Sequence, residues 1–122
     1  MRRNESKTTD LVAELSRALK AERFDQAIDV YDLIEKRKPD DPRWAHRKGD
    51  LLRRIGRDAE AVIAYERAVH LYSEKGFDAR AAATARLLLT IDPSRREVLA
   101  WVDSEAVRRS ERESRNRFQL NY

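Results

Sequence analysis

The chain has 122 residues, of which 39% are charged, and it carries a formal net charge of +4 without a single cysteine. This composition excludes disulfide bonds and thiolate chemistry, and the length suits one domain. No apolar run approaches the roughly 20 residues of a membrane span, and no apolar segment follows the basic N-terminus as in a secretory signal. We therefore expect a cytoplasmic protein.

Apolar residues recur at helical spacing along most of the chain, which predicts an all-α domain of about six helices. In chain order the expected helices span residues 9–22, 24–37, 42–55, 58–75, 77–91 and 94–112. Asp41 and Pro42 are typical of a helix start, whereas Gly56 and Gly76 are typical of helix ends.

The two ends of the chain are polar and lack an apolar stripe. We expect residues 1–8 to be a flexible N-terminus, residues 9–112 to form the helical domain, and residues 113–122 to be a polar tail. In the tail, Phe118, Leu120 and Tyr122 alternate with polar residues, which favours an extended peptide that docks on another copy or stays free.

The middle of the chain contains an internal repeat. Ala27 and Ala61 are 34 residues apart, and so are Tyr31 and Tyr65. In the same frame Glu22 aligns with Gly56. Two helix–turn–helix units therefore align without a gap.

On these residues the chain resembles the tetratricopeptide repeat family over roughly residues 9–107. The best matched unit carries the small, aromatic and apolar residues of that repeat at Trp44, Gly49, Leu52, Gly56, Ala61, Tyr65 and Ala68. The resemblance implies a right-handed superhelix of antiparallel helical hairpins, an α-solenoid, that binds a protein partner in its concave groove. Because only 20 residues separate Gly56 from Gly76, the helix between them is expected to belong to two successive hairpins.

The resemblance also implies which residues line the groove, because the first helix of each hairpin faces it. The positions usually used there fall on Arg43, His46, Asp50, Arg53 and Arg54, and in the preceding unit on Thr9, Val12, Ser16 and Lys20. The carboxylate clamp of the family needs Lys and Asn where this chain has His46 and Asp50, so the resemblance does not extend to that clamp.

The residues themselves show a basic stripe in the same region. Residues 36–57 hold nine Lys or Arg against three Asp. Residues at intervals of three and four share one helix face, and here they are Arg43, Arg47, Asp50, Arg54 and Arg57. Arginine binds carboxylates and phosphates through a planar fork, so the stripe indicates an acidic or phosphorylated segment of a partner protein. The alternative interpretation is a solvated charged face.

Trp101 is a further candidate for partner binding. It lies off the apolar stripe formed by Leu99, Val102 and Ala106, and tryptophan is enriched at binding hot spots. The alternative is that its ring covers the core or the preceding helix.

No pattern indicates catalysis. His46 and His70 lie on different predicted helices without metal-ligand spacing, and the three glycines do not form a phosphate loop. We therefore expect no enzyme activity, no metal and no cofactor.

These observations predict a protein-interaction adaptor or scaffold, as in signalling or complex assembly. One alternative is a nucleic-acid-binding protein that uses the basic stripe within 36–57. Another is a homo-oligomerising structural component that forms a weak dimer through its first helix, residues 9–22.

Overall fold

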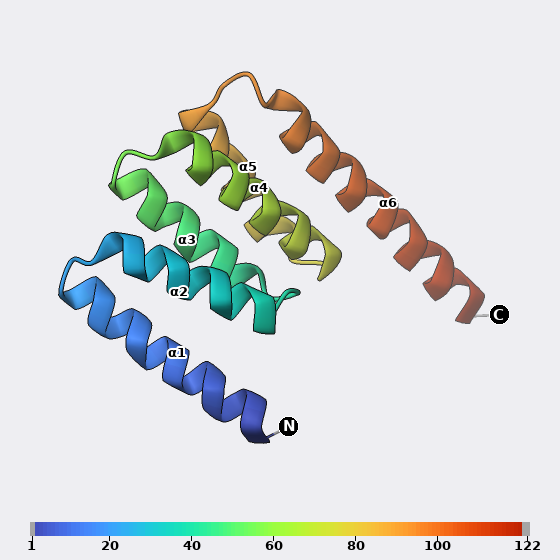
Figure 1. Ribbon diagram of the computed structural model, residues 1–122. Helices are drawn as coiled ribbons and strands as arrows, with labels where there is room; N and C mark the ends of the chain where they lie inside the picture. Colours follow the sequence, from blue (N-terminus) through green and yellow to red (C-terminus); the bar gives the residue numbers. More distant parts are fainter. Residues whose placement is uncertain (1, 121–122) are drawn as a thin grey trace.

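The computed structural model describes the backbone of residues 2–120 and the side chains of residues 7–117. Within this range the chain is all-helical and contains no strand (Figure 1). The helices are α1 (Arg2–Lys20), α2 (Phe24–Arg37), α3 (Pro42–Arg54), α4 (Asp58–Glu74), α5 (Asp78–Ile91) and α6 (Arg96–Leu120). None of the described helices is both long and apolar enough to cross a membrane.

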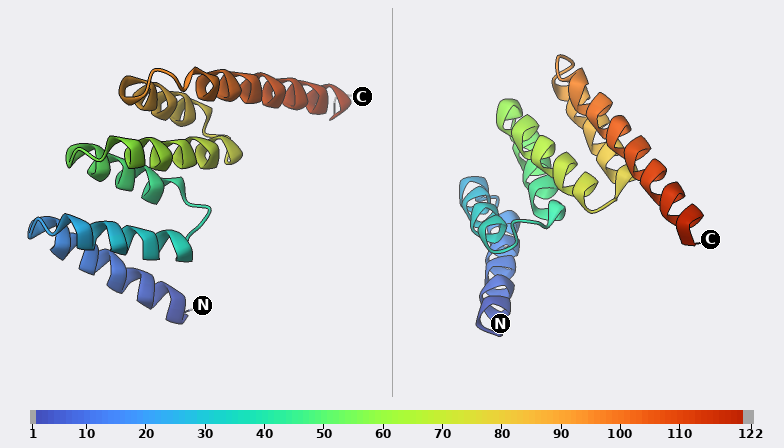
Figure 2. Two further views of the ribbon diagram at one scale, coloured as in Figure 1. Left: turned by 45° about the horizontal axis from the view of Figure 1, so that its top comes forward. Right: turned by 90° about the vertical axis from the view of Figure 1, so that its right-hand side faces the viewer.

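Consecutive helices run in opposite directions and pack against each other in chain order (Figure 1). Helices α1, α3 and α5 lie on one side of the stack, and α2, α4 and α6 lie on the other (Figure 2). The most extensive packing is that of α4 against α3 and against α5, and α4 also touches α6. The helix predicted to belong to two hairpins is therefore the one that packs closely on both of its neighbours.

The two end helices are longer than the sequence predicted. Helix α1 begins at Arg2 rather than near residue 9, and α6 continues to Leu120 rather than ending near residue 112. The extended conformation predicted for Phe118 and Leu120 is thus wrong, and Tyr122 lies outside the described residues.

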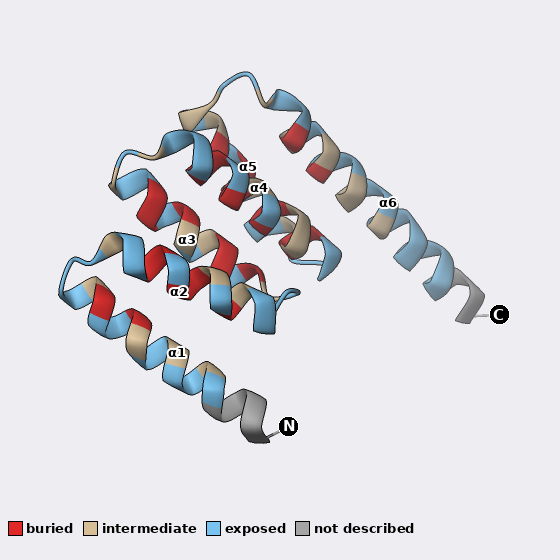
Figure 3. Ribbon diagram, viewed as in Figure 1, coloured by how far each residue is buried: buried red, intermediate tan, exposed pale blue. Residues whose placement is uncertain are grey.

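The extension of α6 shows that an apolar face is not needed to continue a helix. Residues 110–117 are all exposed (Figure 3), but they are mostly Arg, Glu and Ser. Arginine and glutamate have high helix propensity. One turn earlier, an ion pair of 2.7 Å between Arg108 and Glu105 supports the helix at i,i+3 spacing.

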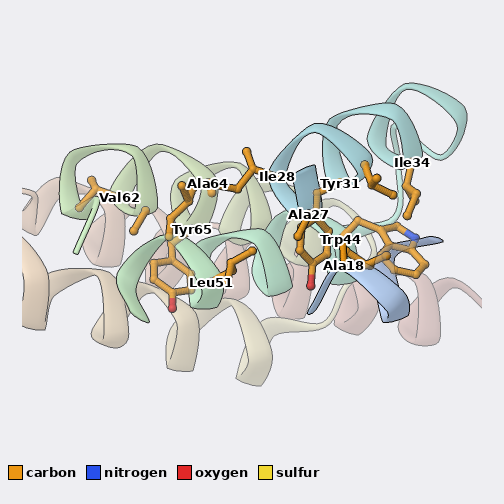
Figure 4. Close-up of a cluster of buried hydrophobic side chains, with 14 of the residues drawn as sticks. Ala18, Ala27, Ile28, Tyr31, Ile34, Trp44, Leu51, Val62, Ala64 and Tyr65 are labelled. Atoms are coloured by element: carbon orange, nitrogen blue, oxygen red, sulfur yellow. The ribbon is translucent and has the colours of Figure 1, made fainter. Parts of the chain in front are cut away.

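The buried side chains form two clusters. The larger one joins α1, α2, α3 and α4 around Ile34, Leu52 and Tyr65, with Leu88 of α5 added (Figure 4). The second joins the end of α4 to α5 and α6 around Val69 and Val102. Helix α4 contributes to both clusters because its N-terminal half faces the first and its C-terminal half the second.

Gly49 allows α3 and α4 to approach closely. A Cβ atom at Gly49 would lie 2.8 Å from Cδ1 and Cε1 of Tyr65. The Tyr65 ring is fully buried and cannot move away without disturbing the core. The small residue that the repeat pattern placed at Gly49 is thus explained by this contact.

We expect the substitution Gly49→Ala to lower the free energy of unfolding by about 2 kcal/mol, because overpacking a close contact outweighs the gain in helix propensity. Urea unfolding followed by circular dichroism measures the change. Replacing Tyr65 by Leu at the same time should recover part of the loss. A Gly49→Ala protein as stable as wild type would contradict the assigned contact.

Three of the interhelical turns have the same backbone structure. In each, the amide N–H of the residue before the next helix bonds to the carbonyl five residues earlier, which is the Schellman arrangement. These bonds run from Arg23 N to Ala18 O at 2.9 Å, from Arg57 N to Leu52 O at 2.8 Å, and from Phe77 N to Tyr72 O at 2.9 Å. The residue in the left-handed conformation is Gly56 with φ of 81° and Gly76 with φ of 80°, but Glu22 with φ of 56° in the first turn.

Glu22 therefore adopts a conformation that costs an L-residue about 1–2 kcal/mol. We expect Glu22→Gly to raise the free energy of unfolding by about 0.5–1 kcal/mol, after the larger chain entropy of unfolded glycine is subtracted. The reciprocal change Gly56→Ala should lower the free energy of unfolding by about 1 kcal/mol, because alanine is strained in the left-handed conformation. No atom lies within 4 Å of the new Cβ, so a steric clash does not add to this loss. Thermal melts of both variants test the pair, and shifts of the same sign would refute it.

Candidate functional site

Helix α3 starts at a well-formed cap that also fixes Arg43. The Asp41 side chain accepts a hydrogen bond of 3.1 Å from the Arg43 backbone N–H, and Pro42 occupies the first turn. The Arg43 guanidinium also donates to Asp41, with Nη2 2.7 Å from Oδ2. Hydrogen bonding to this guanidinium lowers the pKa of the Asp41 carboxyl. Arg43 is thereby held at the start of α3 with its charge already paired.

A polar network lies on the exposed face of α3. His46 Nδ1 is 3.1 Å from the Tyr72 hydroxyl, and His46 Nε2 is 3.8 Å from Asp50 Oδ2. The Tyr65 hydroxyl donates a hydrogen bond of 2.6 Å to Asp50 Oδ1. The His46 ring meets the rings of Tyr65 and Tyr72 edge to face, at centroid distances of 5.8 and 5.9 Å. These contacts orient His46 and Asp50 from both sides.

Three tyrosines place their hydroxyl groups near this network. Figure 4 shows the Tyr31 and Tyr65 rings in the core cluster, with their hydroxyls pointing to the same side. Burial raises the pKa of Tyr31, Tyr65 and Tyr72, and the Asp50 carboxylate raises all three further. The Arg47 guanidinium is close enough to act in the opposite direction on Tyr31 and Tyr72. The Asp50 carboxylate therefore acts electrostatically on all three hydroxyls, and the Arg47 guanidinium acts on those of Tyr31 and Tyr72.

Three arginines on α3 remain without a carboxylate partner among the described side chains: Arg47, Arg53 and Arg54. Arg47 lies over the Trp44 ring at 5.1 Å from its centroid, and Arg54 lies over the Phe24 ring at 5.5 Å. Arg53 is close enough to the Tyr65 hydroxyl to oppose the rise in the pKa of that group. All three arginines are exposed. The aromatic contacts position Arg47 and Arg54 without neutralising them.

Two other cations of the basic segment are neutralised. Lys48 Nζ lies 2.5 Å from Asp32 Oδ1 of α2. Arg57 binds Glu60 at 2.7 Å and Asp25 at 3.3 Å. Arg57 follows α3 and precedes α4, so it does not continue the α3 stripe, and its predicted place on that face is wrong.

The remaining predicted residues lie outside the network. Lys20 is exposed in the last turn of α1. Trp101 is half-buried beside the second core cluster, and its ring centroid is 4.4 Å from that of His70 on α4. Trp101 therefore packs against the second core cluster and against His70 of α4.

Two of the groove positions that the resemblance implies on α1 border a pocket. This pocket has a volume of about 320 Å³ and is lined by Thr8, Thr9, Val12 and Lys38. Thr9 and Val12 thus lie beside Lys38, although the two segments are far apart in the sequence.

Tyr72, like Tyr65, is a network residue that the sequence patterns did not assign to the site. A signal for it was present, because Tyr65 and Tyr72 are two helical turns apart and so share one face of α4. Its bond to His46 joins residues 26 positions apart, which only the packing of α4 on α3 brings together.

Within the described part of the chain, no group of three or more ligand-type side chains is arranged to hold a metal ion. In comparisons with known proteins, no family model matches the chain, and no curated protein matches it either.

The buried tyrosines predict a loss of stability at alkaline pH. Since folding raises the pKa of Tyr65 above the ordinary value of 10.0, its contribution to stability is complete below pH 10 and is lost as the pH rises toward the folded-state pKa. We expect the free energy of unfolding to fall above about pH 10, and to fall less steeply in a Tyr65→Phe variant. Urea titrations between pH 8 and 11.5 measure both slopes, and parallel curves would contradict this assignment.

Proposed function

We propose that this chain is a protein-interaction adaptor that binds an acidic or phosphorylated segment of a partner on the exposed face of α3. The observation that carries the proposal is the set of exposed arginines on that face, Arg47, Arg53 and Arg54, for which the described side chains offer no carboxylate. Charge-assisted hydrogen bonds from such arginines to carboxylate or phosphate are the stronger kind of hydrogen bond in proteins.

The architecture supports a short α-solenoid similar to tetratricopeptide repeats. Helices α1, α3 and α5 lie on one side of the stack, the three Schellman turns repeat one backbone structure, and the small residue Gly49 lets α3 and α4 approach closely. In such a solenoid α3 is the central first helix of a hairpin, and its exposed face belongs to the concave surface.

Preorganisation also supports binding at α3. The arginines project from a regular helix, and aromatic rings already restrict Arg47 and Arg54. When a partner binds, these arginine side chains therefore lose less conformational entropy than arginines on a mobile loop would lose. The Tyr65 and Tyr72 hydroxyls hold Asp50 and His46 in place, and the partly exposed Asp50 and His46 side chains can bond the backbone of an extended segment.

A nucleic-acid interface fits this surface less well. Binding duplex DNA at useful affinity requires several phosphate contacts at once. Three cations of residues 36–57, Arg43, Lys48 and Arg57, are held by carboxylates of the chain itself. The Asp50 carboxylate also stands in the middle of the face.

The proposal is tested with a fluorescein-labelled glutamate-rich peptide and the double variant Arg47→Glu, Arg54→Glu. We expect this variant to bind the peptide at least about tenfold more weakly than wild type, the equivalent of about 1.4 kcal/mol. Fluorescence anisotropy at 50 and 200 mM salt measures the affinities, and circular dichroism confirms folding.

The matched control is Arg112→Glu, Arg115→Glu on the exposed end of α6, which changes the net charge by the same amount. It should bind within about twofold of wild type. Equal losses in both double variants would show that only net charge matters and would reject the α3 site. Tighter binding of a labelled 20-base-pair DNA than of the peptide would favour the nucleic-acid alternative.

A further inference from the structure

A pocket opens next to the N-terminal end of the α3 face. It lies where the α2–α3 loop meets the α4–α5 turn and has a volume of about 350 Å³. This volume is at the lower end of the range of small-ligand sites. Its lining residues are Lys38, Asp40, Asp41, Pro42, Arg43, Tyr72, Lys75, Phe77 and Arg80.

The pocket has an excess of positive charge that the protein does not neutralise. Four cations line it against two carboxylates. Asp41 is bound by Arg43 at 2.7 Å, and Asp40 is 3.9 Å from Lys75. Among the side chains that the structure describes, Lys38 and Arg80 have no acidic partner. An anionic group entering the pocket would therefore meet two free cations.

The walls of the pocket are aromatic and apolar. The Phe77 side chain is 47% exposed, and the Arg80 guanidinium lies 5.6 Å from the centroid of its ring. Tyr72 is nearly buried, with its hydroxyl bonded to His46, and Pro42 supplies a further apolar surface. Arg80 is close enough to the Tyr72 hydroxyl to lower its pKa against the effect of burial. Aromatic rings pack favourably on such a wall.

From this combination we infer that the pocket binds an aryl phosphate, in the form of a phosphotyrosine side chain on the partner segment. The phosphate meets Arg80 and Lys38 while the ring packs on Phe77, Pro42 and Tyr72. A carboxylate side chain would use the cations but leave the aromatic wall uncovered. A cationic ring would meet the same wall against an excess of like charge.

The inference rests on the proposed function in that the same partner segment would continue onto α3. Tyr72 connects the two surfaces, because it lines the pocket and bonds His46 on the α3 face. The pocket therefore predicts a phosphotyrosine at one end of the partner segment.

N-acetyl-phosphotyrosine amide is the probe for the pocket, followed by ¹H–¹⁵N NMR spectra of the full chain. We expect it to shift the amide signals of residues 38–43 and 72–80. N-acetyl-tyrosine amide, N-acetyl-phosphoserine amide and inorganic phosphate should each bind at least about tenfold more weakly, because each lacks either the ring or the phosphate. Inorganic phosphate or the phosphoserine probe binding as tightly as the phosphotyrosine probe would overturn the aromatic part of the site, and no shift in these two segments would overturn the site itself.

Two variants of α5 locate the phosphate contact. Arg80→Gln should weaken binding of the phosphotyrosine probe about tenfold, as expected for the loss of one charge-assisted contact. Arg86→Gln is the matched control, since Arg86 is exposed on the same helix and does not line the pocket. Equal affinities of the two variants would reject the role of Arg80.

The outcomes separate this inference from the proposed function. If the glutamate-rich peptide depends on Arg47 and Arg54 but the phosphotyrosine probe leaves the pocket signals unchanged, the pocket assignment is wrong and the α3 site stands. If the probe binds in the pocket while the peptide is indifferent to Arg47 and Arg54, the α3 site is wrong and the pocket stands.

Discussion

The Tyr65 ring lies directly against Gly49, and this contact sets how closely α3 and α4 pack. Without a side chain at Gly49, α4 packs so close to α3 that its tyrosine ring lies on the α3 backbone. At that separation the Tyr65 hydroxyl reaches Asp50 of α3 and donates a hydrogen bond to it. One packing contact therefore closes the core and also orders the polar face, since the same ring has a buried body and a polar tip.

The position of α4 follows from the repeated turn. The same Schellman bonds close the C-terminal ends of α3 and α4, so the turns before and after α4 have the same backbone structure. Its N-terminal half packs with α3 in the first buried cluster, and its C-terminal half packs with α5 and α6 in the second. Because repeat units mainly contact their neighbours, a helix shared between two clusters connects their stabilities.

The electrostatics of α3 depend on where the available carboxylates are engaged. Asp41 caps the helix and binds Arg43, Asp32 binds Lys48, and Asp50 accepts the Tyr65 hydroxyl. The arginines further along α3 are left on aromatic rings or beside a tyrosine hydroxyl. This division of partners is the physical basis for proposing that an acidic segment of another protein completes the charge balance on α3.

The sequence specifies the helices between residues 24 and 91 locally, because apolar spacing, Pro42 and the two turn glycines act without help from packing. It also identified Arg47, Asp50 and Arg54 as one face of α3. The packing of the helices determines which polar side chains on and after α3 find a partner within the chain. The partners of Arg57, Lys48 and His46 come from other helices. The tertiary structure likewise decided that Glu22 takes the left-handed conformation that glycine has in the other two turns, because packing of α1 on α2 outweighs a local preference. The pocket beside α3 also depends on the packing, because its lining residues fall within 38–43 and 72–80, which are far apart in the sequence.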